Sequence, residues 1–171
     1  MSIEEIKKID IGEGERIPTL NELIAITKGK IKLQAEIIAP GIINDLINIL
    51  REENLISTSI ISSFEIGELL KVKEIEPGLK IGYLIPRALT NIRMVKRYVQ
   101  RAIDNEFYAI HPYYPIVDKE FVDLAQNNGL KVNVFTVNEE EMMRKLINLG
   151  VDGIFTDDIA LLNRTLGRTY Q

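Results

Sequence analysis

The sequence predicts an α/β fold in which parallel strands alternate with helices. Six short segments rich in Ile, Val, Phe or Tyr recur along the chain, and a segment with helical spacing of apolar residues follows each of them. Strands that alternate with helices pair in parallel through right-handed crossovers. The length of 171 residues, with 46% hydrophobic side chains, suits one domain with a sizeable core.

The expected strands are short and bounded by turns. They cover residues 31–38, 57–64, 80–84, 108–111, 132–137 and 153–156. The expected helices that follow them cover residues 41–54, 66–75, 89–102, 118–127, 139–149 and 158–166. In the first of these helices Ile43, Leu46 and Leu50 recur at the spacing of one helical face.

Two further helices are expected before the first strand. Thr19 and Glu22 form a capping box ahead of residues 20–27, and Ser2 with Glu5 forms another that starts a short helix ending before Gly12. Units of roughly 30 residues fit two architectures, an open doubly wound sheet or part of a (β/α)8 barrel. A complete barrel usually needs ~250 residues, so six units do not close one.

The composition excludes several classes of protein. Lys and Arg number 21 and Asp and Glu number 25, so the net charge is 21 − 25 = −4, which argues against a nucleic-acid-binding surface. The absence of Cys excludes disulfide scaffolds, thiolate zinc sites and cysteine nucleophiles, and it is compatible with the cytoplasmic location that we expect. No apolar run approaches the ~18 residues of a transmembrane segment. The charged N-terminus lacks the apolar core of a signal peptide.

Functional side chains in either architecture collect at the carboxyl ends of the strands. That rule selects Glu36, Ser62, Ser63, Phe64, Tyr83, His111, Thr136, Asn138, Thr156 and Asp157. Glu36 is the most informative, because it lies inside the first expected strand on the same face as Lys32 and Gln34. Its carboxylate is either an oxygen ligand for a hard divalent cation or the partner of a neighbouring lysine or loop.

The other polar candidates have structural alternatives. His111 is the one histidine of the chain, and we expect a hydrogen-bonded wall residue because no orienting partner for a general base can be identified. Asn138 is expected to cap the helix over residues 139–149, whose first turn carries glutamates that the helix dipole favours. Asp157 and Asp158 either cap the last helix or point into the pocket at the strand ends.

Four stretches of the sequence carry a resemblance to a known family. They read GERIPTLNELI, KIKLQAEI, IISSFE and VNVFTVNEEEMMRKLINLGVDGIFTD. They resemble strands three to eight of the glycerophosphodiester phosphodiesterases, and the resemblance covers residues 5–162. The last stretch is the most specific. The family reads V-x-V-W-T-V-N, a helix, and then G-V-D-G-I-x-T-D, and Phe135 stands where Trp is usual.

The resemblance implies a (β/α)8 barrel and metal-dependent hydrolysis of glycerophosphodiesters to glycerol 3-phosphate and an alcohol. In such enzymes three carboxylates hold one divalent cation, usually Ca²⁺ or Mg²⁺, which polarises the phosphodiester. Two histidines serve as general acid and general base. The implied cofactor is therefore Ca²⁺ or Mg²⁺, and the implied partner is a small glycerophosphodiester.

Single residues transfer only in part. Glu36 occupies the position of the family's third-strand carboxylate, which implies a metal ligand. Ile38 stands where the family's I-E-I-K motif has a lysine for the phosphate, and an apolar side chain cannot stabilise phosphate charge. Phe64 and Phe135 would line the pocket wall beside the alcohol leaving group. Asn138 matches the end of the seventh barrel strand, and it completes the expected substrate-binding residues.

Family motifs that would precede the helix over residues 20–27 are absent from this sequence. They are a strand ending in H-R-G, a second strand with E-x-D, and an H-D pair, and they would bring both catalytic histidines, an arginine for the phosphate and two of the three metal carboxylates. His111 corresponds to neither histidine, so no catalytic residue transfers. We therefore expect residues 1–171 to form one incomplete barrel domain of about six βα units, with the first two strands missing and no activity as an isolated chain.

Three outcomes stay open for the two strand edges that such a remnant leaves uncovered. A second chain supplies the missing front and completes the site, or the chain forms a homo-oligomer through its edges. Alternatively, the N-terminal helix covers the gap and leaves a non-catalytic remnant that binds a phosphorylated ligand or a protein partner. The isoleucine at position 38 favours the remnant, whereas retention of Glu36 and of the family's T-V-N and G-V-D-G-I-x-T-D patterns favours the enzyme.

Overall fold

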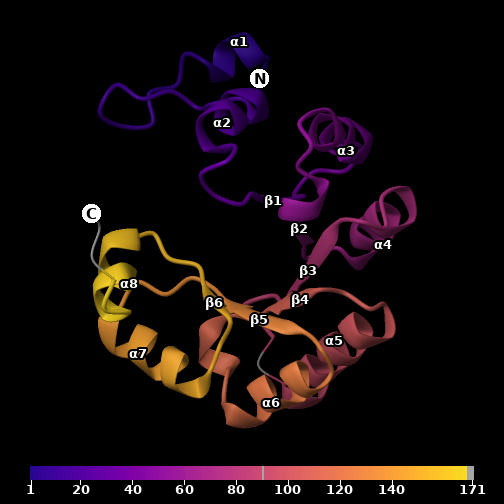
Figure 1. Ribbon diagram of the computed structural model, residues 1–171, viewed down its shortest axis with the longest axis vertical. Helices are drawn as coiled ribbons and strands as arrows, with labels where there is room; N and C mark the ends of the chain where they lie inside the picture. Colours follow the sequence, from indigo (N-terminus) through magenta and orange to yellow (C-terminus); the bar gives the residue numbers. More distant parts are fainter. Residues whose placement is uncertain (90, 169–171) are drawn as a thin grey trace.

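The computed structural model describes residues 1–89 and 91–168. Six strands form one parallel sheet in the order of the chain, β1-β2-β3-β4-β5-β6. The sheet curls, and the helices lie around its outer side (Figure 1). A doubly wound sheet reverses its strand order at a switch point. The sequential order therefore excludes that alternative and confirms a partial (β/α)8 barrel with six βα units.

Each strand is followed by a helix. The strands are β1 (Gln34–Glu36), β2 (Ile60–Ser63), β3 (Lys80–Leu84), β4 (Ala109–His111), β5 (Lys131–Val134) and β6 (Gly153–Ile154). The α-helices are α1 (Ile3–Ile6), α2 (Leu20–Thr27), α3 (Ile43–Glu52), α4 (Ile66–Ile75), α5 (Ile92–Asp104), α6 (Lys119–Asn127), α7 (Glu140–Leu149) and α8 (Ile159–Thr165). Two short 3₁₀ helices, η1 (Ile56–Thr58) and η2 (Tyr114–Ile116), precede β2 and α6.

The strands are shorter than the apolar runs that predicted them. The run over residues 31–38 contributes only Gln34–Glu36 to the ladder, while Ile31 and Ile38 are 67% and 85% exposed. The run over residues 57–64 begins as the 3₁₀ turn η1 before it enters β2. The expected helix over residues 89–102 begins at residue 92 instead, and residue 90 lies outside the described residues.

The helix starts follow the capping signals of the sequence with one exception. Both predicted capping boxes are present, at Ser2 for α1 and at Thr19 for α2. Asp158 caps α8 by accepting a hydrogen bond from the Leu161 amide at 2.8 Å. The prediction that Asn138 caps the helix over residues 139–149 is wrong, because α7 follows directly on Glu139 without a side-chain cap.

The two faces of the sheet carry different side chains. Ile61, Ile81 and Ile110 point outward and are fully buried against the helices, where they belong to the main apolar core. Side chains alternate along a strand, so the neighbouring positions point to the inner face. There the register places Ser62 beside Glu36 on one side and beside Gly82 on the other. The inner face is thus polar and built from small residues near Glu36.

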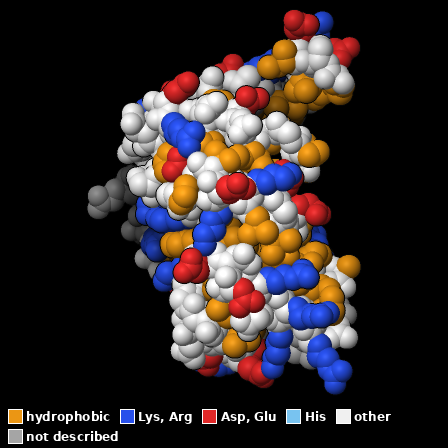
Figure 2. Space-filling view, turned by 90° about the vertical axis from the view of Figure 1, so that its right-hand side faces the viewer, with side chains coloured by type: hydrophobic (Ala, Val, Ile, Leu, Met, Phe, Trp, Pro, Cys, Tyr) orange, Lys and Arg blue, Asp and Glu red, His pale blue; other side chains and the backbone are white. Residues whose placement is uncertain are grey.

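Ion pairs connect successive elements on the outer surface. Figure 2 shows basic, acidic and apolar side chains interspersed over one outer face of the molecule. The pairs that cross between elements include Arg51–Glu76, Lys73–Glu106 and Lys96–Glu120, with N–O distances of 2.8, 3.2 and 2.8 Å. Exposed pairs of this kind contribute about 0–1 kcal/mol each, so the buried core carries most of the stability.

The terminal strands β1 and β6 each pair with a single neighbour within the described residues. Their other edges are open there, and the homo-oligomer or partner chain expected to cover them stays a prediction. None of the described helices has both the length and the apolar character needed to cross a membrane. The cytoplasmic location and the single domain over residues 1–171, whose last three residues lie outside the described chain, also stay predictions.

Candidate functional site

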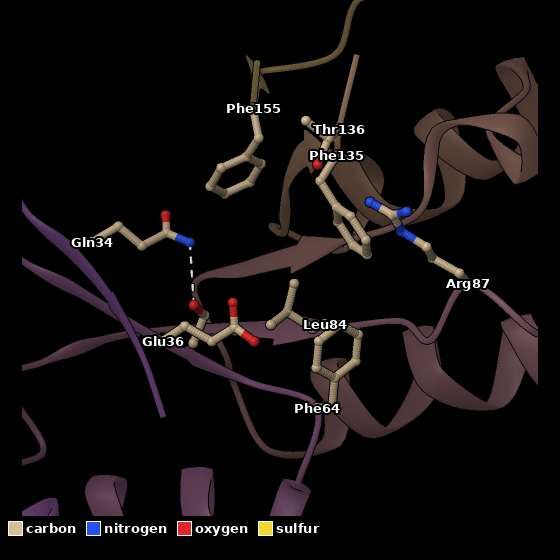
Figure 3. Close-up of a pocket in the computed structure, with 9 residues that line it drawn as sticks. Gln34, Glu36, Phe64, Leu84, Arg87, Phe135, Thr136 and Phe155 are labelled. Carbon is tan, nitrogen blue, oxygen red and sulfur yellow. Dashed lines mark hydrogen bonds between the residues drawn. The ribbon is translucent and has the colours of Figure 1, made fainter. Parts of the chain in front are cut away.

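A cavity of about 450 Å³ opens at the carboxyl ends of the strands, where the fold class predicts function. Its walls come from both halves of the described chain, from β1 through the segment after β6 (Figure 3). The lining residues are Gln34, Glu36, Ser62, Phe64, Leu84, Arg87, Phe135, Thr136 and Phe155. Of the predicted ligand and substrate-binding residues, the structure therefore brings Glu36, Phe64 and Phe135 together.

Glu36 is the acidic group of this cavity. It is the last residue of β1, and within the described chain its carboxylate has neither a hydrogen-bond donor nor a basic partner. Partial burial raises the pKa of Glu36 above its ordinary value of 4.5. Because no lysine pairs with Glu36 among the described residues, the structure does not support the alternative in which a neighbouring lysine is its partner. Beside it, the Gln34 amide donates to the Ser62 hydroxyl at 3.2 Å (Figure 3).

Aromatic rings form the apolar wall. Phe64 and Phe135 meet edge to face with ring centroids 6.1 Å apart, and Phe155 projects into the cavity from the segment after β6 (Figure 3). Tyr113 extends this wall, with its ring 6.2 Å from that of Phe135. Such a wall accommodates an organic group and excludes water from it.

Asn138 lies outside the residues that line the cavity. Its Oδ1 accepts hydrogen bonds from the Asp157 amide at 2.9 Å and from the Thr156 hydroxyl at 3.1 Å, and its Nδ2 donates to the Asp157 carboxylate at 2.8 Å. These bonds tie the segment after β5 to the segment after β6. They account for the T-V-N and T-D patterns structurally, and the substrate contact expected of Asn138 stays a prediction.

Three of the strand-end residues are buried and do not line the cavity. Ser63 is buried and donates to the Ile37 carbonyl at 2.8 Å. Tyr83 is buried on the outer face, where its ring stacks on Tyr98 at 5.0 Å. His111 belongs to the inner face but is fully buried and is not among the residues that line the cavity.

His111 fills a space that only a glycine leaves open. A Cβ on Gly82 would lie 1.9 Å from Nε2 of His111, and the imidazole packs in a T-shaped arrangement against Phe155, with ring centroids 5.2 Å apart. Neither ring nitrogen makes a hydrogen bond of normal geometry among the described residues, although the Asn133 backbone lies close enough to influence the ring. The hydrogen bond expected of this wall residue stays a prediction. Burial lowers the pKa of His111 from 6.5 to about 4, although the backbone of Asn133 acts to raise it.

Arg87 is the lining residue that the sequence did not predict. It lies three positions beyond the end of β3, in the loop that leads to α5. Its Cζ lies 5.1 Å from the ring centroid of Tyr113 and 5.9 Å from that of Phe135. The sequence did contain a signal that could have identified Arg87: it is an arginine shortly after a buried strand, and loops at this end of a barrel carry functional residues.

The donor groups of the cavity do not fit a tightly bound Ca²⁺ or Mg²⁺. Among the described residues there is no group of three or more His, Cys, Asp or Glu side chains that could hold a metal. Glu36 is the one carboxylate among the described lining residues, whereas these cations take about six or more oxygen ligands. The metal-ligand role of Glu36 stays a prediction.

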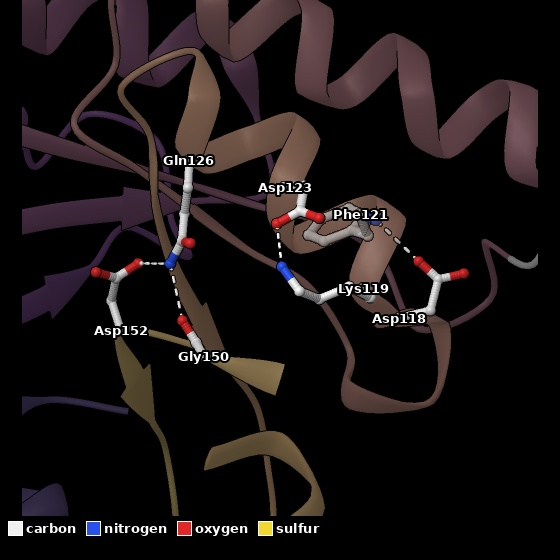
Figure 4. A network of polar contacts seen from close by, with 7 residues as sticks. All are labelled: Asp118, Lys119, Phe121, Asp123, Gln126, Gly150 and Asp152. Atoms are coloured by element: carbon white, nitrogen blue, oxygen red, sulfur yellow. Dashed lines mark hydrogen bonds and ion pairs between the residues drawn. The ribbon is translucent and has the colours of Figure 1, made fainter. Parts of the chain in front are cut away.

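The G-V-D-G motif connects the last two strands. Gly150 ends α7 in the left-handed conformation with φ of 86°. Asp152 then accepts hydrogen bonds from Lys131 at 2.8 Å, from the Val132 amide at 2.9 Å and from Gln126 at 2.9 Å. Figure 4 shows Gln126 of α6 between the Gly150 carbonyl and the Asp152 carboxylate. The motif thus holds the end of the arc together at a distance from the cavity.

Replacement of Asp152 by alanine is expected to lower the free energy of unfolding by about 1–2 kcal/mol, because the amide of buried Val132 and two side-chain donors lose their acceptor. Partial burial acts to raise the pKa of Asp152, but these donors outweigh it and lower the pKa below 3.8. Urea unfolding measures the change. Asp123 offers a matched control, because its carboxylate pairs with a single exposed lysine, Lys119, on the same helix. An equal loss of stability in Asp123→Ala would contradict the stabilising role given to the hydrogen bonds of Asp152.

Comparison with known proteins agrees with this geometry. The model of the glycerophosphoryl diester phosphodiesterase family matches residues 1–161. A glycerophosphodiester phosphodiesterase of Caldanaerobacter subterraneus subsp. tengcongensis is 38% identical over 170 residues, which cover 92% of this chain and 68% of that protein. An identity of 38% over most of both chains is high enough to establish common descent.

Solved structures show the same fold. The crystal structure of a putative glycerophosphodiester phosphodiesterase from Galdieria sulphuraria superimposes with a TM-score of 0.86 at 27% identity, over 98% of this chain and 71% of that one. A phosphodiesterase from Oleispira antarctica, in complex with its product sn-glycerol-3-phosphate, gives a TM-score of 0.81 at 25% identity, over 97% and 70%. Together with the family match, they establish that this chain belongs to the glycerophosphoryl diester phosphodiesterase family.

Proposed function

We propose that this chain binds a glycerophosphodiester at the carboxyl ends of its strands, and that the 171-residue polypeptide by itself does not hydrolyse it. The observation that carries the binding proposal is the cavity, in which Glu36, Arg87 and a wall of aromatic rings converge. A glycerophosphodiester combines a phosphate, hydroxyl groups and an organic alcohol. The cavity offers a cation, polar side chains and an apolar wall for these three parts.

The proposal gives each side of the cavity a part of the ligand. The alcohol group lies against Phe64 and Phe135, whose rings meet edge to face. The hydroxyl groups of the glycerol face the polar side chains of Gln34 and Thr136. The proposal goes beyond family membership, because each part of the ligand is assigned to its own wall of the cavity.

The proposed lack of activity follows from the residues that acid–base hydrolysis needs. A general acid and a general base must both reach the reacting oxygens. His111 is the single histidine of the chain, and it is fully buried, does not line the cavity and has a pKa lowered to about 4. The described residues also lack a cluster that would hold a catalytic cation. A polypeptide that carries H-R-G and E-x-D motifs would have to supply these groups.

A second candidate function is a non-catalytic domain that binds a phosphorylated ligand or a protein partner. Ile38 favours it. The side chain is 85% exposed, and in the family resemblance it stands in the place of a phosphate-binding lysine. A domain that no longer catalyses hydrolysis can lose the positive charge of that lysine without any effect on turnover. Both candidates keep the same cavity and differ in whether added motifs restore hydrolysis.

The proposal is tested with the purified chain and glycerophosphocholine. Binding is followed by isothermal titration calorimetry, and hydrolysis by release of glycerol 3-phosphate with Ca²⁺, with Mg²⁺ and with EDTA. We expect binding without turnover. The control is Glu36→Ala, which removes the one acidic group among the described lining residues.

Each outcome has a distinct meaning. Metal-dependent turnover that disappears in Glu36→Ala would show that the chain is active, and it would overturn the second half of the proposal. Absence of binding would overturn the first half. Addition of a polypeptide with the H-R-G and E-x-D motifs then separates the two candidates, because turnover appears only if this chain retains a working half of the site.

A further inference from the structure

The cavity contains a positively charged side chain with no acidic partner. Arg87 is the one basic residue among the described residues that line it, and no ion pair or hydrogen bond of its guanidinium occurs in the described chain. Resting on the function proposed above, we propose that Arg87 binds the phosphate of the ligand and so fixes where the phosphodiester lies in the cavity. A phosphodiester anion is the chemistry that complements an unpaired guanidinium.

The surroundings of Arg87 position the guanidinium without using its donors. Its Cζ lies 5.1 Å from the ring centroid of Tyr113 and 5.9 Å from that of Phe135, which are cation–π distances. A ring contact of this kind involves no N–H hydrogen bond. The guanidinium donors therefore stay available for two phosphate oxygens at once, the fork geometry that lysine lacks.

The opposite charges of the cavity are separated. Figure 3 shows Arg87 on one side of the group of lining side chains and Glu36 on the other, with Phe64 and Phe135 between them. No ion pair joins the two within the described residues. Without a cation at Glu36, its carboxylate repels a phosphate, so electrostatics places the phosphate at the Arg87 end of the cavity when the binding experiment is done in EDTA.

The neighbours of Arg87 also indicate the chemical class of the ligand. Phe135 contacts both the guanidinium and Phe64, so an organic substituent on the phosphate meets an apolar wall directly beside the charge. A free inorganic phosphate uses only the guanidinium. We therefore expect a phosphate ester with an organic substituent to bind more tightly than inorganic phosphate does.

The test compares binding of four probes by isothermal titration calorimetry. They are glycerophosphocholine, glycerol 3-phosphate, inorganic phosphate and uncharged glycerol. The wild-type chain is expected to bind the two esters more tightly than inorganic phosphate, and glycerol least of all. Arg87→Gln is expected to weaken the two esters by about tenfold or more, since hydrogen bonds to charged groups contribute that much. Arg87→Lys, which keeps the charge but loses the fork, is expected to fall between the two.

The matched control is Arg93→Gln. Arg93 is exposed on α5 outside the cavity, so this variant has the same net charge as Arg87→Gln and should bind like the wild type. Thermal melting of each variant checks that it is folded. Rising salt should weaken the wild type more than Arg87→Gln, a response that a merely structural role would not produce.

Two kinds of failure are distinguishable. If the wild type binds the esters and Arg87→Gln binds them equally well, while Phe135→Ala binds them weakly, Arg87 is not the phosphate ligand and the proposed function stands. An equal loss in Arg87→Gln and Arg93→Gln would reduce the effect to net charge and also overturn the inference. If the wild type binds none of the phosphates, the proposed function fails together with it.

Discussion

Replacement of Gly82 by alanine is expected to lower the free energy of unfolding by about 3 kcal/mol. The new Cβ would lie 1.9 Å from Nε2 and 2.6 Å from Cδ2 of His111, far inside the contact distance of two carbon or nitrogen atoms. The imidazole cannot withdraw freely, because it is fully buried and packs edge-on against Phe155. The strand or the ring has to move, and guanidinium unfolding measures the cost.

Two variants control this prediction. Gly67 lies in α4 with nothing near the position of a Cβ, so Gly67→Ala should be neutral or stabilising by up to about 1 kcal/mol. In the Gly82→Ala/His111→Ala double variant the clash is removed, so its loss should be smaller than the sum of the two single losses. Strict additivity of the two losses would show that the ring of His111 is not what excludes a side chain at Gly82.

Acidification from about pH 6.5 to pH 4 is expected to remove roughly 3 kcal/mol of stability through His111 alone. Burial lowers the pKa of His111 to about 4 in the folded chain, while the unfolded chain titrates near 6.5. Between these values the unfolded chain binds a proton that the folded chain rejects, so stability falls as the pH falls. The contribution is complete above the unfolded pKa and is lost at the folded pKa.

The measurement is the free energy of unfolding at a series of pH values for the wild type and His111→Leu. Leucine does not titrate, so the difference in slope between the two proteins isolates the histidine from the many carboxylates. A leucine that packs poorly shifts the whole curve but leaves its slope unaffected. Equal slopes for both proteins over this range would contradict the assignment of the acid sensitivity to His111.

Local signals in the sequence were sufficient for the order and type of the elements. The capping boxes at Ser2 and Thr19 act within four residues, and both are present as predicted. Strand length was overestimated, because an apolar residue such as Ile31 belongs to a β-rich run without entering the ladder. Pairing depends on how far the neighbouring strand extends, and this is a tertiary property.

Site residues could be predicted wherever their position along a strand alone places them at the cavity. Glu36, Phe64 and Phe135 end strands or directly follow them, and the parallel fold brings such positions to one edge. Arg87 escaped prediction because its importance depends on the distant Tyr113 and Phe135, which hold it over the cavity. Asn138 carried a strong local capping signal, but Asp157, nineteen residues later, binds its side chain instead.

The sequential strand order makes the described part of the molecule a row of units in which each strand pairs its backbone only with the strand before it and the strand after it. β2 to β5 are held on two sides, whereas β1 and the two-residue β6 are held on one. In such a row, local opening costs least at the ends and most in the middle. The cavity takes Glu36 from one end and Phe155 from the other, so fraying of either end disassembles it long before the centre unfolds.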